Sequence, residues 1–232
     1  MHILIVTHHA ELNLLRTTLA LLDHNLRGKY EIHVVWNETV ALPDLELHNQ
    51  TLKVYPLDEF IPDRYARSHP LVYNCRDPHK RGYWRQQVIK LVFPAPTRWC
   101  VDSKNRLWRP IDLRQWDGLH PLRTVEPAWH SSAEEYGDPQ HTYSSMTPFL
   151  ITDFVLDIDT AMDLVEDHLR KHGAGFSEFV YYTATTGDRP KRIAEHPMPF
   201  THRRGPSTLF LYRARQLDQQ LELNGPAVAN TE

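Results

Sequence analysis

The sequence predicts an α/β fold with a mostly parallel sheet flanked by helices, because strand-like and helix-like segments alternate from its start. Residues 2–7, HILIVT, form an almost continuous apolar run, as expected of a strand buried on both faces. Leucines then repeat at helical spacing from residue 12 to residue 26, and Gly28 closes that segment. The run YEIHVVWNE at 30–38 is β-branched and aromatic. Strand, helix and strand in this order predict a right-handed parallel crossover.

The later elements are predicted from the same patterns. Strands are expected at 51–57, at 97–102 and at 148–158, the last passing into a turn. Helices are expected at 81–93 and after Thr160, which with Asp163 matches a capping box. Residues 177–186 fit either a helix or a strand, and residues 208–223 fit a strand followed by a helix.

Two polar stretches interrupt these elements. The segment 58–80 contains prolines and lacks periodicity, which predicts a long loop over the functional site. The segment 103–146 is rich in Trp, Pro and His with little periodicity, so functional loops are expected there as well. We expect a single domain with long loops over residues 1–215, followed by a helix or fraying tail at 216–232.

Composition and the start of the chain bound the class of protein. The 232 residues are 41% hydrophobic and 24% charged, as in soluble globular domains. No apolar run approaches the roughly 18 residues of a membrane span, so no membrane insertion is expected. The start, MHILIVTHHAEL, lacks a basic segment and indicates a strand instead of a signal peptide. Cys75 and Cys100, the only cysteines, have no zinc-binding spacing, which favours a cytoplasmic protein.

Positive charge is concentrated in two blocks, although the net charge is −3. Residues 64–123 contain 13 Lys or Arg and 4 Asp or Glu, whereas residues 189–215 contain 7 basic residues and only Glu195 as an acid. Arginine outnumbers lysine by 19 to 7, and guanidinium groups suit phosphate recognition. The blocks favour a phosphate-bearing or polyanionic ligand, with solvated charged faces as the ordinary alternative.

The predicted helix at 81–93 precedes a strand that ends in an acidic residue. Spacing by four and three places Tyr83, Gln87 and Lys90 on one face of this helix, which can face a ligand or simply solvent. Asp102 follows the strand in VDSKN, at the end where open α/β sheets bind ligands. A carboxylate there can ligate a metal, accept a hydrogen bond from a hydroxyl, or cap an ordinary turn, since Asp, Ser and Asn all favour turns.

Together these stretches resemble the landmarks of GT-A-type glycosyltransferases, in particular a poorly characterised bacterial and viral branch. The landmarks are the helix WRQQVIKL, the apolar strand running into VDSKNRLWRPID, and the distant pair TPFLI and SEFVYY. In that branch a W-x-Q-Q-x-x-K-L helix precedes a strand that ends in D-S-D, and an Arg-Pro pair follows. The resemblance covers residues 1–185 and implies a GT-A-like (Rossmann-like) domain. Its nucleotide-sugar half is expected at 1–110 and its acceptor half at 111–215.

The resemblance also implies a site that binds a nucleotide-sugar, with UDP-glucose as the first candidate, and transfers its hexose to a hydroxyl acceptor. Donor contacts are expected from Thr7, His8, Asn37, Tyr83, Gln87, Lys90, Ser103 and Asn105. Acceptor contacts are expected from Arg81, Trp84, Arg109, Thr147, Asp153, Arg203 and Arg204. Catalytic roles are expected for Asp102, Lys104 and Glu178.

The sequence departs from the family at Lys104, where the second aspartate of the Asp-X-Asp motif would stand. In the family these carboxylates hold Mn²⁺ or Mg²⁺, which neutralises the leaving diphosphate. An ammonium group removes a ligand and repels a cation. One account is that Lys104, with Arg106 or Lys90, stabilises the diphosphate without a metal. The other is that Asp102 and a late histidine, His196 or His202, still bind a metal weakly. A non-catalytic turn is the third reading.

A transfer with inversion needs a carboxylate that deprotonates the acceptor hydroxyl as it attacks. Glu178 is predicted for this role, with Asp153 as the second choice. The structural alternative for Glu178 is a position at a helix N-terminus after Ser177, where the helix dipole favours a carboxylate.

The acceptor is predicted from charge and from the resemblance. Basic blocks interleaved with aromatic residues suit nucleic acid, and the branch includes viral enzymes that glycosylate hydroxymethylated DNA bases. Double-stranded phage DNA with a 5-hydroxymethylcytosine-like base, extruded from the duplex, is therefore the first prediction. A cell-surface glycan or lipid-linked sugar is the alternative acceptor. A non-catalytic nucleotide-sugar-binding module is the alternative function.

Overall fold

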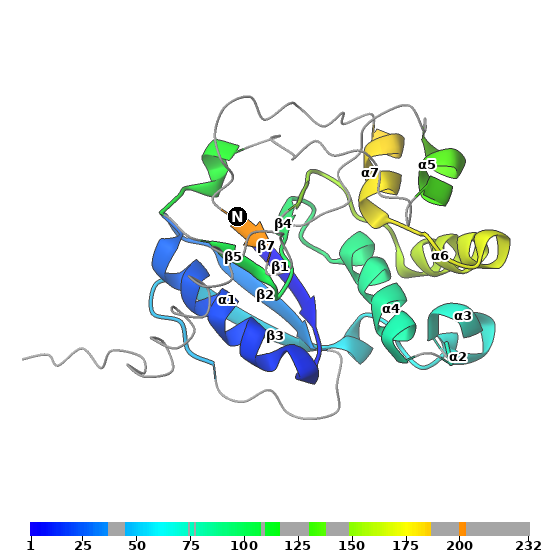
Figure 1. Ribbon diagram of the computed structural model, residues 1–232, viewed down its shortest axis with the longest axis horizontal. Helices are drawn as coiled ribbons and strands as arrows, with labels where there is room; N and C mark the ends of the chain where they lie inside the picture. Colours follow the sequence, from blue (N-terminus) through cyan, green and yellow to red (C-terminus); the bar gives the residue numbers. More distant parts are fainter. Residues whose placement is uncertain are drawn as a thin grey trace, which may run out of the picture.

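A computed structural model gives the structure of the protein (Figure 1). It describes residues 1–36, 45–73, 75–76, 78–107, 110–116, 130–137, 149–186 and 200–202. These residues contain a five-stranded sheet in the order β3-β2-β1-β4-β6. The strands are β1 (His2–Thr7), β2 (Glu31–Trp36), β3 (Thr51–Pro56), β4 (Arg98–Cys100) and β6 (Phe149–Ile151).

The sheet is mostly parallel, as predicted. β1 pairs in parallel with β2 and β4, β2 pairs in parallel with β3, and β6 is antiparallel to β4. The chain first fills one side of β1 with β2 and β3, and then crosses over to place β4 on the other side. This reversal of strand order makes the carboxyl ends of β1 and β4 a topological switch point, where open α/β sheets bind ligands.

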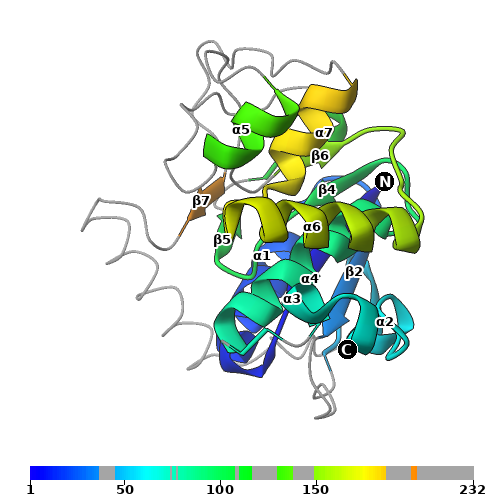
Figure 2. The same ribbon diagram turned by 90° about the vertical axis from the view of Figure 1, so that its right-hand side faces the viewer.

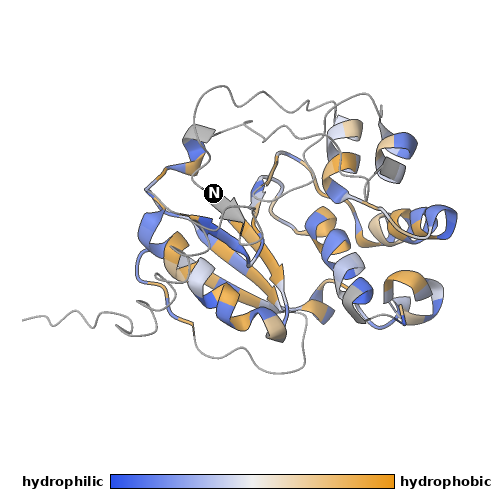
Figure 3. Ribbon diagram, viewed as in Figure 1, coloured by the Kyte–Doolittle hydropathy of each residue, from blue (hydrophilic) through white to orange (hydrophobic). Residues whose placement is uncertain are grey.

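Helices cover both faces of the sheet (Figures 1 and 2). On one face lies α1 (Leu12–Asn25), whose buried leucines pack with Ile3, Ile5, Ile32 and Val34. On the other face lie α4 (Pro78–Val92), α6 (Ile158–His172) and α7 (Glu178–Thr186), which bury Leu4, Val6 and Val35. Because alternate residues of a strand face opposite layers, β1 and β2 are apolar along their length, as the orange strands of Figure 3 show.

Shorter elements connect these layers. They are η1 (His9–Glu11), η2 (Leu57–Glu59), α2 (Tyr65–Ser68), α3 (Pro70–Tyr73), η3 (Leu113–Trp116) and α5 (His130–Tyr136). A second, two-stranded antiparallel sheet pairs β5 (Asn105–Leu107) with β7 (Phe200–His202). α5 and β5 lie within the stretch that lacked periodicity in the sequence.

The prediction of an irregular loop at 58–80 is wrong, because η2, α2 and α3 lie there and α4 begins at Pro78. These short helices are held by contacts with α6. The Glu166 carboxylate accepts hydrogen bonds from the backbone N–H groups of Leu71 and Val72 at 3.0 Å, and His69 lies 2.8 Å from Asp163. The helical order of this segment therefore comes from residues distant in sequence, which periodicity does not register.

The start of α6 also differs from the prediction. Its N-cap is Asp157, whose carboxylate accepts from the Thr160 backbone N–H at 2.8 Å and from the Thr160 hydroxyl at 2.6 Å. Thr160 is thus inside the helix and does not cap it. Residues 177–186, which fitted a helix or a strand, form helix α7 from Glu178. The predicted elements at 208–223 and the tail at 216–232 lie outside the described residues.

Two further observations concern the cysteines and the lengths of the helices. Cys75 and Cys100 are both free thiols, and burial raises the pKa of Cys100 to about 11. Among the described helices, none has the length and apolar character needed to span a membrane.

Candidate functional site

The carboxyl ends of β1 and β4 bring two acidic residues together. Beyond β4, the Val101 backbone N–H still donates to the Leu4 carbonyl of β1 at 2.9 Å, so Asp102 emerges beside the end of β1. β1 ends at Thr7 and the chain turns through η1, which ends at Glu11. Asp102 and Glu11 therefore meet at the switch point of the sheet.

Asp102 is part of a well-formed turn. Its backbone N–H donates to Asn105 Oδ1 at 2.7 Å, and its Oδ1 accepts from the Lys104 backbone N–H at 2.8 Å. Ser103 and Asn105, predicted to contact the donor, are both buried in this turn. The turn and the acidic site are thus compatible, because the turn holds the Asp102 carboxylate at the end of the sheet.

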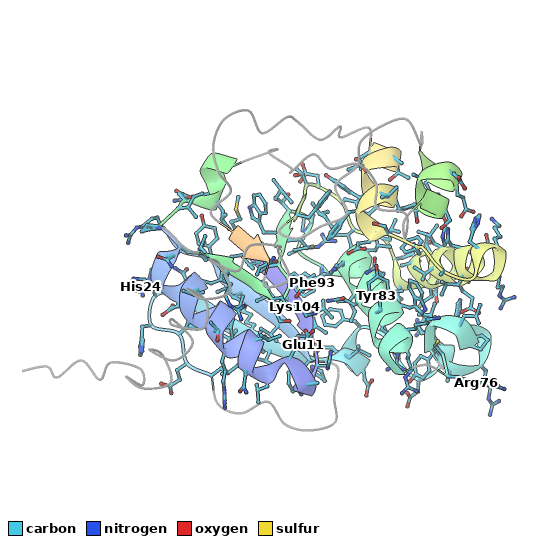
Figure 4. The ribbon with its side chains drawn as sticks, viewed as in Figure 1. Glu11, His24, Arg76, Tyr83, Phe93 and Lys104 are labelled. Atoms are coloured by element: carbon cyan, nitrogen blue, oxygen red, sulfur yellow. The ribbon has the colours of Figure 1, made fainter. Side chains whose placement is uncertain are left out.

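Lys104 points back to Glu11. Its ammonium forms an ion pair with Glu11 Oε1 and lies 3.8 Å from Asp102 Oδ1. Lys104 and Glu11 are labelled next to each other in Figure 4. Glu11 Oε2 accepts hydrogen bonds from Ser103 and, at 3.2 Å, from Thr7. Burial of Glu11 opposes ionisation, but the hydrogen bonds from Lys104 and Ser103 lower its pKa below the usual value. Lys104 therefore bridges two carboxylates.

Glu11 is the functional candidate that the sequence did not reveal. It lies far from Asp102 in the chain, and its only signal is an acidic side chain just after the first strand. His8, a predicted donor contact, lies 3.9 Å from Glu11. The site thus holds two acids and one ammonium group, with a histidine beside them.

A second polar centre joins α4 to the first turn of α7. The Glu178 backbone N–H donates to Gln87 Oε1 at 3.2 Å, and the Lys90 ammonium lies 2.7 Å from Glu178 Oε1. Lys90 also lies 4.9 Å from the centre of the Phe179 ring. Gln87, Lys90 and Glu178 are exposed by only 2%, 6% and 2%, so this is a buried ion pair.

The charges of this centre are coupled to one another and to Asp102. Burial raises the pKa of Glu178, although the Lys90 ammonium opposes the rise. Burial alone lowers the pKa of Lys90, but the carboxylates of Glu178 and, more weakly, Asp102 raise it above the usual value. Tyr83 also lies here, and burial together with the Glu178 charge raises its pKa. Predicted donor residues of α4 and the predicted base Glu178 thus share one environment.

The helix α4 also contacts the end of β1 directly. Gln86 donates to the Val6 carbonyl at 2.8 Å, which ties the helix to the strand end next to Thr7. Trp84, a predicted acceptor contact, is buried in the core, whereas Arg81 is half-buried. Gln86 was not on the predicted face of this helix, because that prediction considered only the spacing of Tyr83, Gln87 and Lys90 along it.

Asp153 lies at the opposite end of the sheet from Asp102, where the parallel strands begin. It follows β6, which runs antiparallel to β4, so its side chain meets Thr97 at the start of β4, with 3.1 Å between Thr97 Oγ1 and Asp153 Oδ1. The structure therefore does not bring Asp153 together with Asp102. The predicted residues Asn37, Arg109, Thr147, His196, Arg203 and Arg204 lie outside the described residues.

His202 is described only by its backbone, and this is placed next to the acidic turn. In the β5–β7 pair, His202 is the partner of Asn105, three residues after Asp102. Of the two predicted late histidines, His202 thus belongs to a strand beside the motif.

The arrangement of strands and helices is similar to that of a solved structure of a sugar-transferring enzyme. A galactosyltransferase, LgtC, solved in complex with donor and acceptor sugar analogs, superposes with a TM-score of 0.57. The match covers 99% of this chain and 98% of that chain at 10% sequence identity. The fold is GT-A-like, as predicted.

A second structure, mouse xyloside xylosyltransferase 1 in its apo form, gives a TM-score of 0.46 at 11% identity over 82% of each chain. No protein-family model matches the sequence, and no curated protein matches it either. The likeness is therefore one of fold alone, and the chemistry depends on the residues at the switch point.

Proposed function

We propose that this protein is a nucleotide-sugar-dependent glycosyltransferase that moves a hexose to a hydroxyl acceptor. The observation that carries the proposal is the meeting of Glu11, Lys104 and Asp102 at the switch point of a GT-A-like sheet. A sugar diphosphate needs cationic charge around its phosphates and hydrogen-bond acceptors for its hydroxyl groups. The ammonium and the two carboxylates supply both within one cluster.

The two polar centres are assigned different roles in one reaction. The acceptor oxygen bonds to the anomeric carbon of the sugar while the bond from that carbon to the diphosphate breaks, and its electron pair leaves with the diphosphate. For transfer with inversion, the acceptor proton passes to a carboxylate, for which we propose Glu178. Its raised pKa suits a proton acceptor, and Lys90 orients its carboxylate. Gln87 fixes the backbone from which Glu178 projects.

The leaving diphosphate needs a counter-charge, and the chain offers two sources. Carboxylate oxygens are the ligands that Mg²⁺ and Mn²⁺ prefer, so Asp102 and Glu11 fit a divalent ion that replaces the Lys104 ammonium between them. Such an ion, when bound, would neutralise the diphosphate charge. Alternatively, Lys104 stays between the two acids and itself contacts the diphosphate. His202 would be the further metal ligand in the first account, because its strand runs beside the acidic turn.

UDP-sugars are the first donors to test, with UDP-glucose leading. Thr7, His8 and the α4 residues Gln87 and Lys90 are the proposed donor contacts. Asp102→Asn and Glu11→Gln should each abolish sugar release from the donor. Glu46→Gln, an exposed acid before β3, is the matched control and should keep full turnover. If the chain neither binds nor turns over any nucleotide-sugar, the proposal fails.

DNA carrying hydroxymethylated bases remains the first proposed acceptor, and a glycan or lipid-linked sugar the alternative. The basic block at 64–123 supports DNA less than its charge suggests, because Lys90, Arg98 and Arg106 are buried. Arg98, for example, donates to the carbonyls of Ala95 and Phe154 at 2.7 and 2.8 Å. A mobility shift with hydroxymethylated duplex at low salt tests this acceptor; absence of a shift would remove it and leave the transferase proposal intact.

A non-catalytic nucleotide-sugar-binding module is the second candidate. It is favoured by the neutralised acidic cluster around Lys104 and by the burial of Glu178 in an ion pair. Tight donor binding without release of the sugar, in the presence and absence of Mn²⁺, would support the module over the enzyme.

A further inference from the structure

A cluster of histidines and one glutamate lies away from the switch point, between α5 and α6. His168 and His172 are one helical turn apart on α6, with ring centres 4.6 Å apart. Glu135 of α5 directs one oxygen, Oε2, to both of them: it makes a hydrogen-bond contact with His168 Nδ1 and lies 3.2 Å from His172 Nε2. Figures 1 and 2 show α5 beside α7 and over α6.

The two ring nitrogens of His168 face different partners. Its Nε2 lies 3.3 Å from Ser131 Oγ, and that hydroxyl lies 3.2 Å from the Ala174 carbonyl, to which it donates. With the serine proton used in this way, the Ser131 oxygen can accept from His168 Nε2–H. In that tautomer of the neutral ring, Nδ1 carries a lone pair that faces the Glu135 carboxylate, and a cation between the two can bind both.

The composition and spacing of the cluster fit a metal ion. The His168 side chain is fully buried, so its ring is held in place beside Glu135. The three ligand atoms lie within 4.8 Å of one another. Two imidazole nitrogens and one carboxylate oxygen are a common zinc ligand set, with bonds of about 2.0–2.2 Å. An ion at this position would take the Nδ1 lone pair, and the Ser131 contact would fix the ring orientation, as outer partners of zinc-bound histidines do.

We propose that Glu135, His168 and His172 form a Zn²⁺ site that ties α5 to α6. Lys171 already neutralises Glu135 through Oε1 at 2.9 Å, but it also reaches Asp167 at 2.7 Å and can move there. The Glu135 oxygen that faces the histidines is the other one, Oε2.

Helix α5 links the proposed metal site to the start of α7. Ser132, next to the serine that contacts His168, donates to the Gly175 carbonyl at 2.7 Å and accepts from the Ser177 backbone N–H at 2.9 Å. These bonds hold the residue that precedes Glu178. Zn²⁺ at the cluster thus stabilises the platform on which α7 begins.

One other cluster among the described residues, His2, Glu31 and His33, has a comparable spacing. There His2 Nδ1 and His33 Nε2 lie 2.9 Å apart, so a single shared proton satisfies the pair. The Glu31 carboxylate forms an ion pair with Lys53, with 2.7 Å between Oε2 and Nζ. This cluster needs no cation and serves as the comparison in the test.

The test is Zn²⁺ titration of the untagged full chain after chelator treatment, followed by calorimetry and by the absorption spectrum of Co²⁺ in its place. One ion per chain is expected, with a higher melting temperature in Zn²⁺. His172→Asn and Glu135→Gln should weaken binding by at least about tenfold, as the loss of a ligand or of its support does. The matched controls are His24→Asn, on the exposed side of α1, and His2→Asn in the other cluster; both should bind like the parent chain. Circular dichroism checks that every variant is folded.

Three results would overturn the proposal: no Zn²⁺ binding by the parent chain, binding that survives both His172→Asn and Glu135→Gln, and binding that His2→Asn removes. His172 is partly exposed, so its loss leaves the core intact and keeps the test decisive. Lys171→Ala provides an independent test. It removes the ammonium that pairs with Glu135, so Zn²⁺ should bind more tightly.

Discussion

The Lys90 ammonium lies 2.7 Å from the Glu178 carboxylate, and both side chains are buried between α4 and α7. The pair joins a helix from the first half of the chain to one from the second. A buried pair is costly to break by removing one partner, because the other charge is then left unpaired in the interior. The same residues are proposed to position and to carry the base of the transfer reaction.

Stability and catalysis can be separated at this pair. Glu178→Gln and Lys90→Met should each lower the free energy of unfolding by about 3–5 kcal/mol, because each leaves a buried partner unsatisfied. The double variant Lys90→Met/Glu178→Gln should recover most of that loss in urea unfolding. Transfer should remain absent in the double variant. Recovery of stability together with recovery of turnover would show that the pair is structural only.

The role of Lys104 is tested by Lys104→Met, which removes the ammonium from between Glu11 and Asp102. A unit charge about 4 Å from a divalent ion contributes roughly 2–8 kcal/mol of repulsion, so Mn²⁺ affinity should rise at least about tenfold. Lys104→Arg keeps the charge and is the control. If Lys104→Met gains Mn²⁺-dependent activity, the metal account is favoured. Loss of activity that no metal restores favours Lys104 as the counter-charge of the diphosphate.

Stability should depend on pH through His33. Burial, with a further effect of His2, lowers its pKa from 6.5 to about 4. The folded state therefore binds this proton less readily than the unfolded chain, so the contribution to stability is present above pH 6.5 and is lost as pH falls towards 4. The free energy of unfolding should fall by up to about 1.4 kcal/mol per pH unit within this window. His33→Gln, which cannot titrate, should flatten this slope; an unchanged slope would assign it to other groups.

The cap of α6 offers a prediction on the fold. Asp157→Ala should destabilise the protein by about 1 kcal/mol, since the N-terminal N–H of Thr160 loses its acceptor. Asp157→Ser retains a capping oxygen and should recover most of the loss in thermal unfolding. If alanine and serine at this position are equally stable, Asp157 does not act as the cap.

The sequence alone predicted the parallel strands at the start of the sheet and the main helices that flank them. The apolar runs of β1 and β2 and the leucine spacing of α1 are local patterns that require burial on two faces, and burial of this kind allows few arrangements. Strand, helix and strand in order also determined the parallel crossover. The position of Asp102 at a strand end followed from the same reasoning.

The tertiary structure alone decided the partners at the site. Glu11 meets Lys104 because β4 lies beside β1 on the side away from β2, and strand order leaves no trace in local periodicity. Asp153, which follows a strand as Asp102 does, lies at the opposite end of the sheet because β6 runs antiparallel to β4. Lys90 and Glu178 meet through the packing of α4 on α7. Ion pairs depend on contacts between residues distant in the chain, and only the folded arrangement sets these distances.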